Sequence, residues 1–184
     1  QTISLSLSDR PRFFDPRSFE SLMRMNYFTI SANTVIYRRD QLLAIGGYRI
    51  DLEWQADWFA NLVLAFRYGA CYVPGALAHF RVVKRSYSAT GTSDGAGQRR
   101  LLYHTLDVLR DEYADVAPRF RRAALIPEMR IRDLYWLLTS SRHRRFVTPA
   151  LYRRIFAREV WSHLRPFTPV TVRLYLRKRL GNRT

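Results

Sequence analysis

Apolar residues in the second half of the chain recur at the three- and four-residue spacing of an α-helix. Because this period does not suit a strand, the residues from Gln98 onward are predicted to fold mainly as helices, and five prolines divide them into separate segments. Residues 170–176 fit either a strand or a helix, and we predict a helix. The three apolar stripes are Leu102, Leu106, Leu109 and Tyr113; Ile131, Leu134, Tyr135 and Leu138; and Tyr152, Phe156, Val160 and Leu164.

Shorter and more varied elements precede this helical part. Asp15 is placed to cap a helix that starts at Pro16. Asp40 is placed to cap a brief helix at 41–45 that a Gly-Gly pair ends. Runs of β-branched and aromatic residues predict strands at 34–37, 71–73 and 77–83.

The clearest single element is an amphipathic helix at residues 57–68. Trp58, Leu62 and Phe66 lie on one face of it, and Gly69 supplies a C-terminal stop. Asp57 stands at the head of this helix, where the helix dipole and free N–H groups keep a carboxylate ionised. The carboxylate is therefore available as a base, although an ordinary N-cap explains an aspartate there equally simply.

A loop rich in Gly, Ser and Thr at 86–97 separates the two parts of the chain. We place the boundary within residues 88–98. The predicted organisation is an α/β part, residues 1–90, followed by an all-α extension, residues 91–184, in a chain that is helix-dominated overall.

Positive charge is concentrated in the second part. The chain has 31 Lys and Arg against 15 Asp and Glu, a net charge of +16. Residues 117–184 hold 17 basic and 3 acidic side chains, a balance of +14, so the rest of the chain contributes only +2. Such a segment attracts an anionic partner, which charge alone does not identify.

Cysteine usage and hydropathy bear on the compartment. Cys71 is the only cysteine, so no disulfide can form within the chain, and a reducing, cytoplasmic compartment fits best. No apolar run approaches the roughly 18 residues of a spanning helix, and the first residues do not form a signal peptide.

An ordered series of motifs occupies about 55 residues, from 33 to 88. Its pieces are Ala32-Asn33-Thr34-Val35-Ile36-Tyr37-Arg38-Arg39, Gly46-Gly47-Tyr48, Ala56-Asp57-Trp58, Gly69, Pro74, Phe80-Arg81 and Ser86-Tyr87-Ser88. This series resembles the second half of the GT-A domain of family 2 glycosyltransferases. The resemblance implies an inverting transferase in which Asp57 is the catalytic base.

The resemblance also implies roles for other residues. Trp54, Trp58, Tyr48 and Asn33 would bind the acceptor, a glycan or a lipid-linked sugar. The donor is a nucleotide sugar, and its diphosphate would be covered by Arg81, Lys84, Arg85, Ser86 and Ser88. The tryptophans fit a hydrophobic core equally well, and the basic cluster fits a solvated turn.

Two departures from the family pattern concern the metal and the donor. The family's Asp-x-Asp motif, which holds Mg²⁺ or Mn²⁺, is absent, as is the β-α-β segment that binds the nucleoside. Val83 stands where many members have a metal-binding histidine, and Asp51 and Glu53 are better explained as solvated acids. We therefore assign no metal ligand and expect a separate N-terminal nucleotide-binding half to supply the metal site.

The basic helices leave three interpretations open. Arginines beside apolar stripes are typical of a helix on an anionic membrane surface, which would place the protein peripherally on the inner face of a membrane. A helical extension packed on the catalytic part explains the same pattern. A helical module that binds nucleic acid is less favoured because no nucleic-acid motif is present. A non-catalytic partner half is a further alternative to the enzyme. The basic residues concerned are Arg142, Arg144, Arg145, Arg153, Arg154, Arg158, Arg165, Arg173, Arg177, Lys178 and Arg179.

Overall fold

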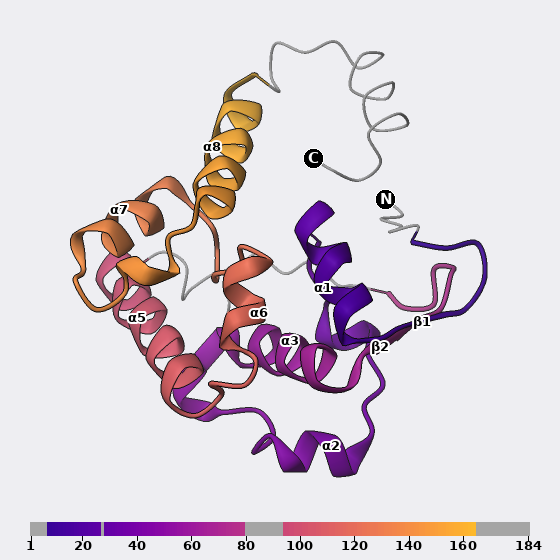
Figure 1. Ribbon diagram of the computed structural model, residues 1–184. Helices are drawn as coiled ribbons and strands as arrows, with labels where there is room; N and C mark the ends of the chain where they lie inside the picture. The colour runs from indigo at the N-terminus through magenta and orange to yellow at the C-terminus, as the bar shows by residue number, and fades with distance from the viewer. Residues whose placement is uncertain (1–6, 27, 80–93, 165–184) are drawn as a thin grey trace.

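A computed structural model describes residues 7–26, 28–79 and 94–164, and helices dominate it (Figure 1). The predicted predominance of helix is confirmed. The described α-helices are α1 (Pro16–Met25), α2 (Arg39–Ala44), α3 (Ala56–Tyr68), α5 (Gly95–Asp111), α6 (Ala117–Arg122), α7 (Ile131–Thr139) and α8 (Pro149–Leu164). Short 3-10 helices are η1 (Ala32–Thr34), η2 (Ile50–Gln55) and η3 (Arg144–Phe146).

The sheet of the described residues has two short antiparallel strands, β1 (Arg12–Phe14) and β2 (Ala70–Tyr72). The strand predicted at 71–73 is confirmed with a shift of one residue. The strand predicted at 34–37 is wrong, because Thr34 ends η1 and the next residues are irregular. A β-branched run becomes a strand only beside a pairing partner, which this segment lacks within the described chain. Of the predicted strand at 77–83, residues 77–79 are irregular and the others lie outside the described residues.

Helix boundaries follow local chemistry. The Asp15 carboxylate accepts hydrogen bonds from the backbone N–H groups of Arg17 at 2.8 Å and Ser18 at 3.1 Å, so α1 begins at Pro16 as predicted. The prediction that Asp40 caps α2 is wrong. The helix begins at Arg39, one residue before Asp40, so Asp40 lies in the first turn. There the carboxylate still favours the helix through the dipole.

Gly69 ends α3 with a φ of 82° and lets β1 approach closely. A Cβ atom at this position would lie 2.5 Å from the carbonyl oxygen of Phe14. Glycine alone satisfies both the left-handed backbone and this contact.

The middle of the molecule is α3, which has α1, α2 and α6 around it (Figure 1). Residues 59–66 are all buried, so this helix is enclosed on every side. Phe120 of α6 is 0% exposed, and its ring centroid lies 5.1 Å from that of Phe66 and 6.2 Å from that of Phe59. Residues from both sides of the predicted boundary therefore share one hydrophobic core.

Arg154 fixes α8 against the ends of two other helices. Its guanidinium donates hydrogen bonds to the carbonyl oxygens of Met23 at 2.7 Å and Arg24 at 2.9 Å, near the end of α1. It also donates to the carbonyl oxygen of Ala123 at 2.7 Å, at the end of α6. A cation at a helix C-terminus satisfies free carbonyls and opposes the dipole.

The three predicted apolar stripes differ in how far their residues are buried. In the first stripe, Leu102, Leu106 and Leu109 on α5 and Tyr113 after it are all buried. On α7 the structure buries Leu134 of the predicted stripe together with Leu137, and on α8 it buries Leu151 and Ile155, which are outside the stripe. The exposed members of these stripes are Ile131, Tyr135, Leu138, Tyr152, Phe156 and Val160. None of the described helices combines the length and the apolar character that crossing a bilayer requires.

Replacement of Phe120 by alanine should destabilise the whole protein. The side chain is enclosed by aromatic rings, so its loss leaves a cavity and should lower the free energy of unfolding by about 3–5 kcal/mol. Chemical denaturation should show one shifted transition, because the core is shared. The matched control is Phe156→Ala at an exposed ring, which should cost less than about 1 kcal/mol. A change below 1 kcal/mol in Phe120→Ala would contradict the shared core.

Candidate functional site

Asp57 lies in the first turn of α3 and is half-buried. The N-cap is Gln55, so the simple capping explanation of Asp57 is wrong. The Oδ1 atom of Asp57 accepts a hydrogen bond of 2.7 Å from the backbone N–H of Trp58. Among the described residues, no Lys, Arg or His side chain comes within 4 Å of this carboxylate. It is thus a helix-head carboxylate without an ion pair in this part of the chain.

Two tyrosines and a buried amide form a hydrogen-bonded chain on the same side of α3. The Tyr48 hydroxyl donates to the Tyr37 oxygen at 2.8 Å, and the Tyr37 hydroxyl donates to Asn61 Oδ1 at 2.6 Å. Asn61 is only 5% exposed, and its Nδ2 donates to the carbonyl oxygen of Ile30 at 3.0 Å. Because Asn61 follows Asp57 by four residues, the two side chains share one helix face.

The charge on Asp57 influences the pKa of Tyr37 in this hydrogen-bonded chain. Burial raises the pKa of Tyr37 far above its ordinary value, with further contributions from the Tyr48 hydrogen bond and the charge on Asp57. Tyr37 therefore stays protonated and remains a donor to Asn61. We call Asp57, Tyr37, Tyr48 and Asn61 the Asp57 cluster. It combines one potential base with phenol groups that suit hydrogen bonding to a sugar.

The other predicted acceptor residues are placed differently. Trp58 is half-buried, and its ring meets Phe120 edge-on with 5.9 Å between centroids, so it contributes to the core. Trp54 is half-buried, and its indole N–H has no hydrogen-bond partner among the described residues. Asn33 is exposed in η1, where its side-chain oxygen accepts from the Ser31 hydroxyl. The predicted diphosphate residues Arg81, Lys84, Arg85, Ser86 and Ser88 lie outside the described residues.

Tyr37 and Asn61 were not among the sequence-predicted site residues. The signal for Asn61 is its four-residue spacing from Asp57, which places both on one side of a helix. Tyr37 directly precedes the Arg-Arg pair, but its contact with α3 depends on how the 30–37 segment folds back.

The acids that precede Asp57 are engaged in ion pairs. Asp51 lies 2.8 Å from both Arg49 and His104, and the Arg49 hydrogen bond is the main cause that holds the pKa of Asp51 well below its usual range. Glu53 pairs with Arg100 at 3.6 Å and has a left-handed φ of 48°. The described residues contain no group of three His, Cys, Asp or Glu side chains that could hold a metal ion.

An open depression of about 410 Å³ lies near the Gly-Gly end of α2. Its polar lining comes from Arg49, Arg67 and Glu112, and Asp57 does not line it. This depression is therefore separate from the Asp57 carboxylate.

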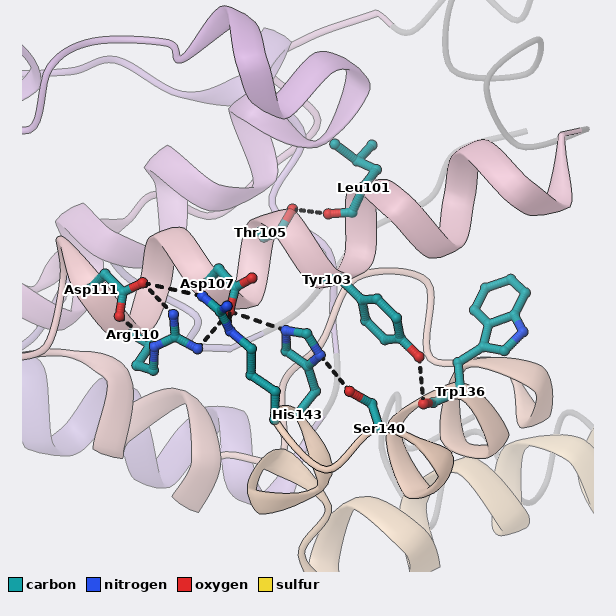
Figure 2. A network of polar contacts seen from close by, with 10 residues as sticks. Leu101, Tyr103, Thr105, Asp107, Arg110, Asp111, Trp136, Ser140 and His143 are labelled. Atoms are coloured by element: carbon teal, nitrogen blue, oxygen red, sulfur yellow. Dashed lines mark hydrogen bonds and ion pairs between the residues drawn. The ribbon is translucent and has the colours of Figure 1, made fainter.

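A second polar cluster, drawn in Figure 2, joins α5 to the segment after α7. His143 Nε2 lies 3.1 Å from Asp107 Oδ1, and His143 Nδ1 lies 2.8 Å from the Ser140 hydroxyl. Asp107 Oδ1 also accepts from Arg110 at 2.6 Å and Arg142 at 2.8 Å. This set of residue types is that of a Ser-His-Asp nucleophile.

The geometry of this cluster supports a structural role instead. Two arginines neutralise Asp107, and the Tyr103 ring stacks on the buried His143 ring with 4.3 Å between centroids. A neutral imidazole satisfies both neighbours, because Nε2–H donates to Asp107 while Nδ1 accepts from Ser140. The cluster therefore fastens the end of α7 to α5.

The burial of His143 should make folding stability depend on pH. Burial lowers the pKa of His143 below its ordinary value of 6.5. As the pH falls through 6.5, the unfolded chain takes up the proton first, so the stabilisation present above 6.5 is lost towards the lower folded pKa. His143→Gln should give a flatter plot of unfolding free energy against pH in this window, measured by denaturant titration. His163→Gln, at an exposed histidine of α8, should keep the wild-type slope. Equal slopes for wild type and His143→Gln would contradict the prediction.

Comparison of the chain with protein families, with characterised proteins and with solved structures gave no match. The resemblance to family 2 glycosyltransferases therefore depends on the motif series in residues 33–88 and on no similarity beyond it.

Proposed function

We propose that this chain is the acceptor-side part of an inverting GT-A glycosyltransferase. The observation that carries the proposal is the Asp57 cluster, in which a helix-head carboxylate without an ion pair among the described residues lies on the same face as a tyrosine-bound amide. The motif series from Asn33 to Ser88 supplies the second support.

In the proposed reaction Asp57 removes the proton from the acceptor hydroxyl. The freed electron pair forms a bond to the anomeric carbon of the donor sugar, while the bond to the diphosphate oxygen breaks and its electrons leave with the nucleoside diphosphate. Attack from the opposite face inverts the anomeric centre. A carboxylate at a helix N-terminus suits this role as a base.

Tyr48 and Tyr37 would orient the acceptor in this scheme. Tyr48 is exposed, so its phenol and ring can contact a sugar, whereas Tyr37 connects it to the buried amide of Asn61. This arrangement reduces the conformational freedom of the Tyr48 side chain. Trp54 remains a proposed acceptor-binding residue. Trp58 packs on Phe120 in the core, so we propose a smaller role for it in acceptor binding.

The residues proposed to bind the donor are outside the described part of the chain. Arg81, Lys84, Arg85, Ser86 and Ser88 would cover the leaving diphosphate, whose developing charge needs cations opposite it. The resemblance implies Mg²⁺ or Mn²⁺, but the described residues do not form a site for either ion. Because the chain has no Asp-x-Asp motif, the proposal assigns the metal ligands and the nucleoside site to a nucleotide-binding half outside these 184 residues.

Replacement of Asp57 by asparagine tests the base. In an enzyme assembly that contains the nucleotide-binding half, Asp57→Asn should lower kcat by about 10² to 10⁴ while donor affinity stays nearly unchanged. The amide keeps the size of the side chain and its acceptor oxygen but removes its basicity. Steady-state kinetics and a thermal melt separate loss of catalysis from loss of folding.

The matched control for this variant is Asp40→Asn. Asp40 is also an acid in the first turn of a helix, but it is exposed and paired with Arg38 at 2.9 Å. The Asp40→Asn variant should lose only the helix-dipole stabilisation, about 0.3–1 kcal/mol of unfolding free energy, and should keep the wild-type turnover. Near-normal turnover in Asp57→Asn would remove Asp57 from the mechanism.

The 184-residue chain by itself should bind nucleotide sugars weakly at best. It contains neither an Asp-x-Asp motif nor the β-α-β segment that holds the nucleoside. Calorimetric titration with nucleoside diphosphates and Mn²⁺ should therefore give no micromolar affinity. A micromolar dissociation constant would show that the donor site is within this chain and would contradict the division into halves.

A further inference from the structure

The face of α8 that points away from the core carries three exposed apolar side chains. Tyr152 is 53% exposed, Phe156 is 54% exposed and Val160 is 40% exposed. Their spacing of four residues puts them on one stripe. The rings of Tyr152 and Phe156 lie parallel, with centroids 6.2 Å apart and planes at 4°. Nothing in the described part of the chain covers this stripe.

The rest of α8 shows why this face stays outward. Leu151 and Ile155 are buried on the opposite side, and Arg154 bonds to the helix ends beneath them. Arg158 donates to the carbonyl oxygen of Glu128 at 2.6 Å. Four residues thus fix the rotation of α8, so the exposed stripe cannot be buried by turning the helix.

Positive charge dominates the segment that contains the stripe. Residues 141–164 contain six arginines and one acid, Glu159. Among the described residues, no carboxylate comes within 4 Å of Arg144, Arg145 or Arg153. Arg153 precedes Phe156 by three residues and Glu159 follows it by three, so one basic and one acidic side chain flank the stripe. A cover for this face must accept apolar side chains, and the net positive charge of the segment favours a cover that carries negative charge.

We propose that the exposed face of α8 rests on a bilayer that contains anionic lipid, with Tyr152, Phe156 and Val160 in the interfacial layer and Arg153 among the headgroups. Aromatic rings beside arginines suit the boundary between headgroups and acyl chains. Residues 165–184 add six basic and no acidic side chains, which strengthens the attraction to the same surface.

Two other occupants fit less well. A second copy of the chain would bring the same arginines and a net charge of +16 against the first, and this repulsion opposes pairing through α8. A nucleic acid would satisfy the arginines through phosphates but would leave three apolar side chains without apolar contacts. This inference is independent of the transferase proposal, because it requires no activity.

Vesicle sedimentation with the full chain tests the proposal. The wild type should bind vesicles of phosphatidylcholine with phosphatidylglycerol, bind phosphatidylcholine vesicles little, and lose affinity at high salt. The double variant Tyr152→Ser/Phe156→Ser keeps the net charge but removes both rings, and its affinity for the anionic vesicles should fall about tenfold or more. Arg153→Glu should weaken the same binding by about tenfold.

Leu43→Ser on α2 is the matched control. Leu43 is 57% exposed, and α2 lies far from α8 (Figure 1). This variant should bind as the wild type does, and Phe156→Leu should retain most of the affinity. Thermal melts of all variants should agree, since none removes a core side chain.

Four outcomes would overturn the proposal. They are equal binding of the wild type to both vesicle types, binding to neither, unchanged binding of the double variant, and displacement from anionic vesicles by duplex DNA at equal phosphate concentration. Sedimentation velocity adds a fifth. A wild-type dimer that the double variant converts to a monomer would assign the face to a second copy instead.

Discussion

Complete burial of α3 is the constraint on which the rest of the structure depends. Eight consecutive residues of this helix are buried, so other elements must cover it on every side. No short chain segment can do so alone, and the cover comes from α1, α2 and α6, with Phe120 between the aromatic rings of α3. Enclosure leaves the ends of α3 as its accessible parts. The proposed base, Asp57, occupies the N-terminal end, where the backbone N–H groups and the dipole favour a carboxylate.

The one buried amide of α3 has a large effect on its surroundings. Asn61 must be hydrogen-bonded once it is enclosed, and its partners are the Tyr37 hydroxyl and the Ile30 carbonyl. These bonds hold the irregular 30–37 segment beside the helix and bring Tyr48 with it. A single polar residue in an apolar helix thus assembles the Asp57 cluster from three separate segments.

The excess of arginine serves two physical purposes. Inside the molecule, Arg119 and Arg122 neutralise the nearly buried Glu20, whose pKa is lowered chiefly by its hydrogen bond with Arg122. Arg154 donates hydrogen bonds to backbone carbonyl oxygens at the ends of α6 and α1. Arginines such as Arg153 have no such acid within the described chain and remain as exposed charge. The formal charge therefore overstates what is available to a partner, and the exposed subset beside α8 is the part that a membrane could use.

The sequence by itself determined the elements whose cause is local. Asp15 with Pro16 set the start of α1, Gly69 set the end of α3, and the apolar period gave the helices of the second half. Tertiary structure decided everything that depends on a distant partner. It left residues 35–37 irregular because no neighbouring strand pairs with them in the described chain. It also decided which apolar face of α7 and of α8 is buried, through packing on the core and, for α8, through the hydrogen bonds of Arg154. It also joined Asn61 to Tyr37, a contact between residues 24 positions apart that no local pattern encodes.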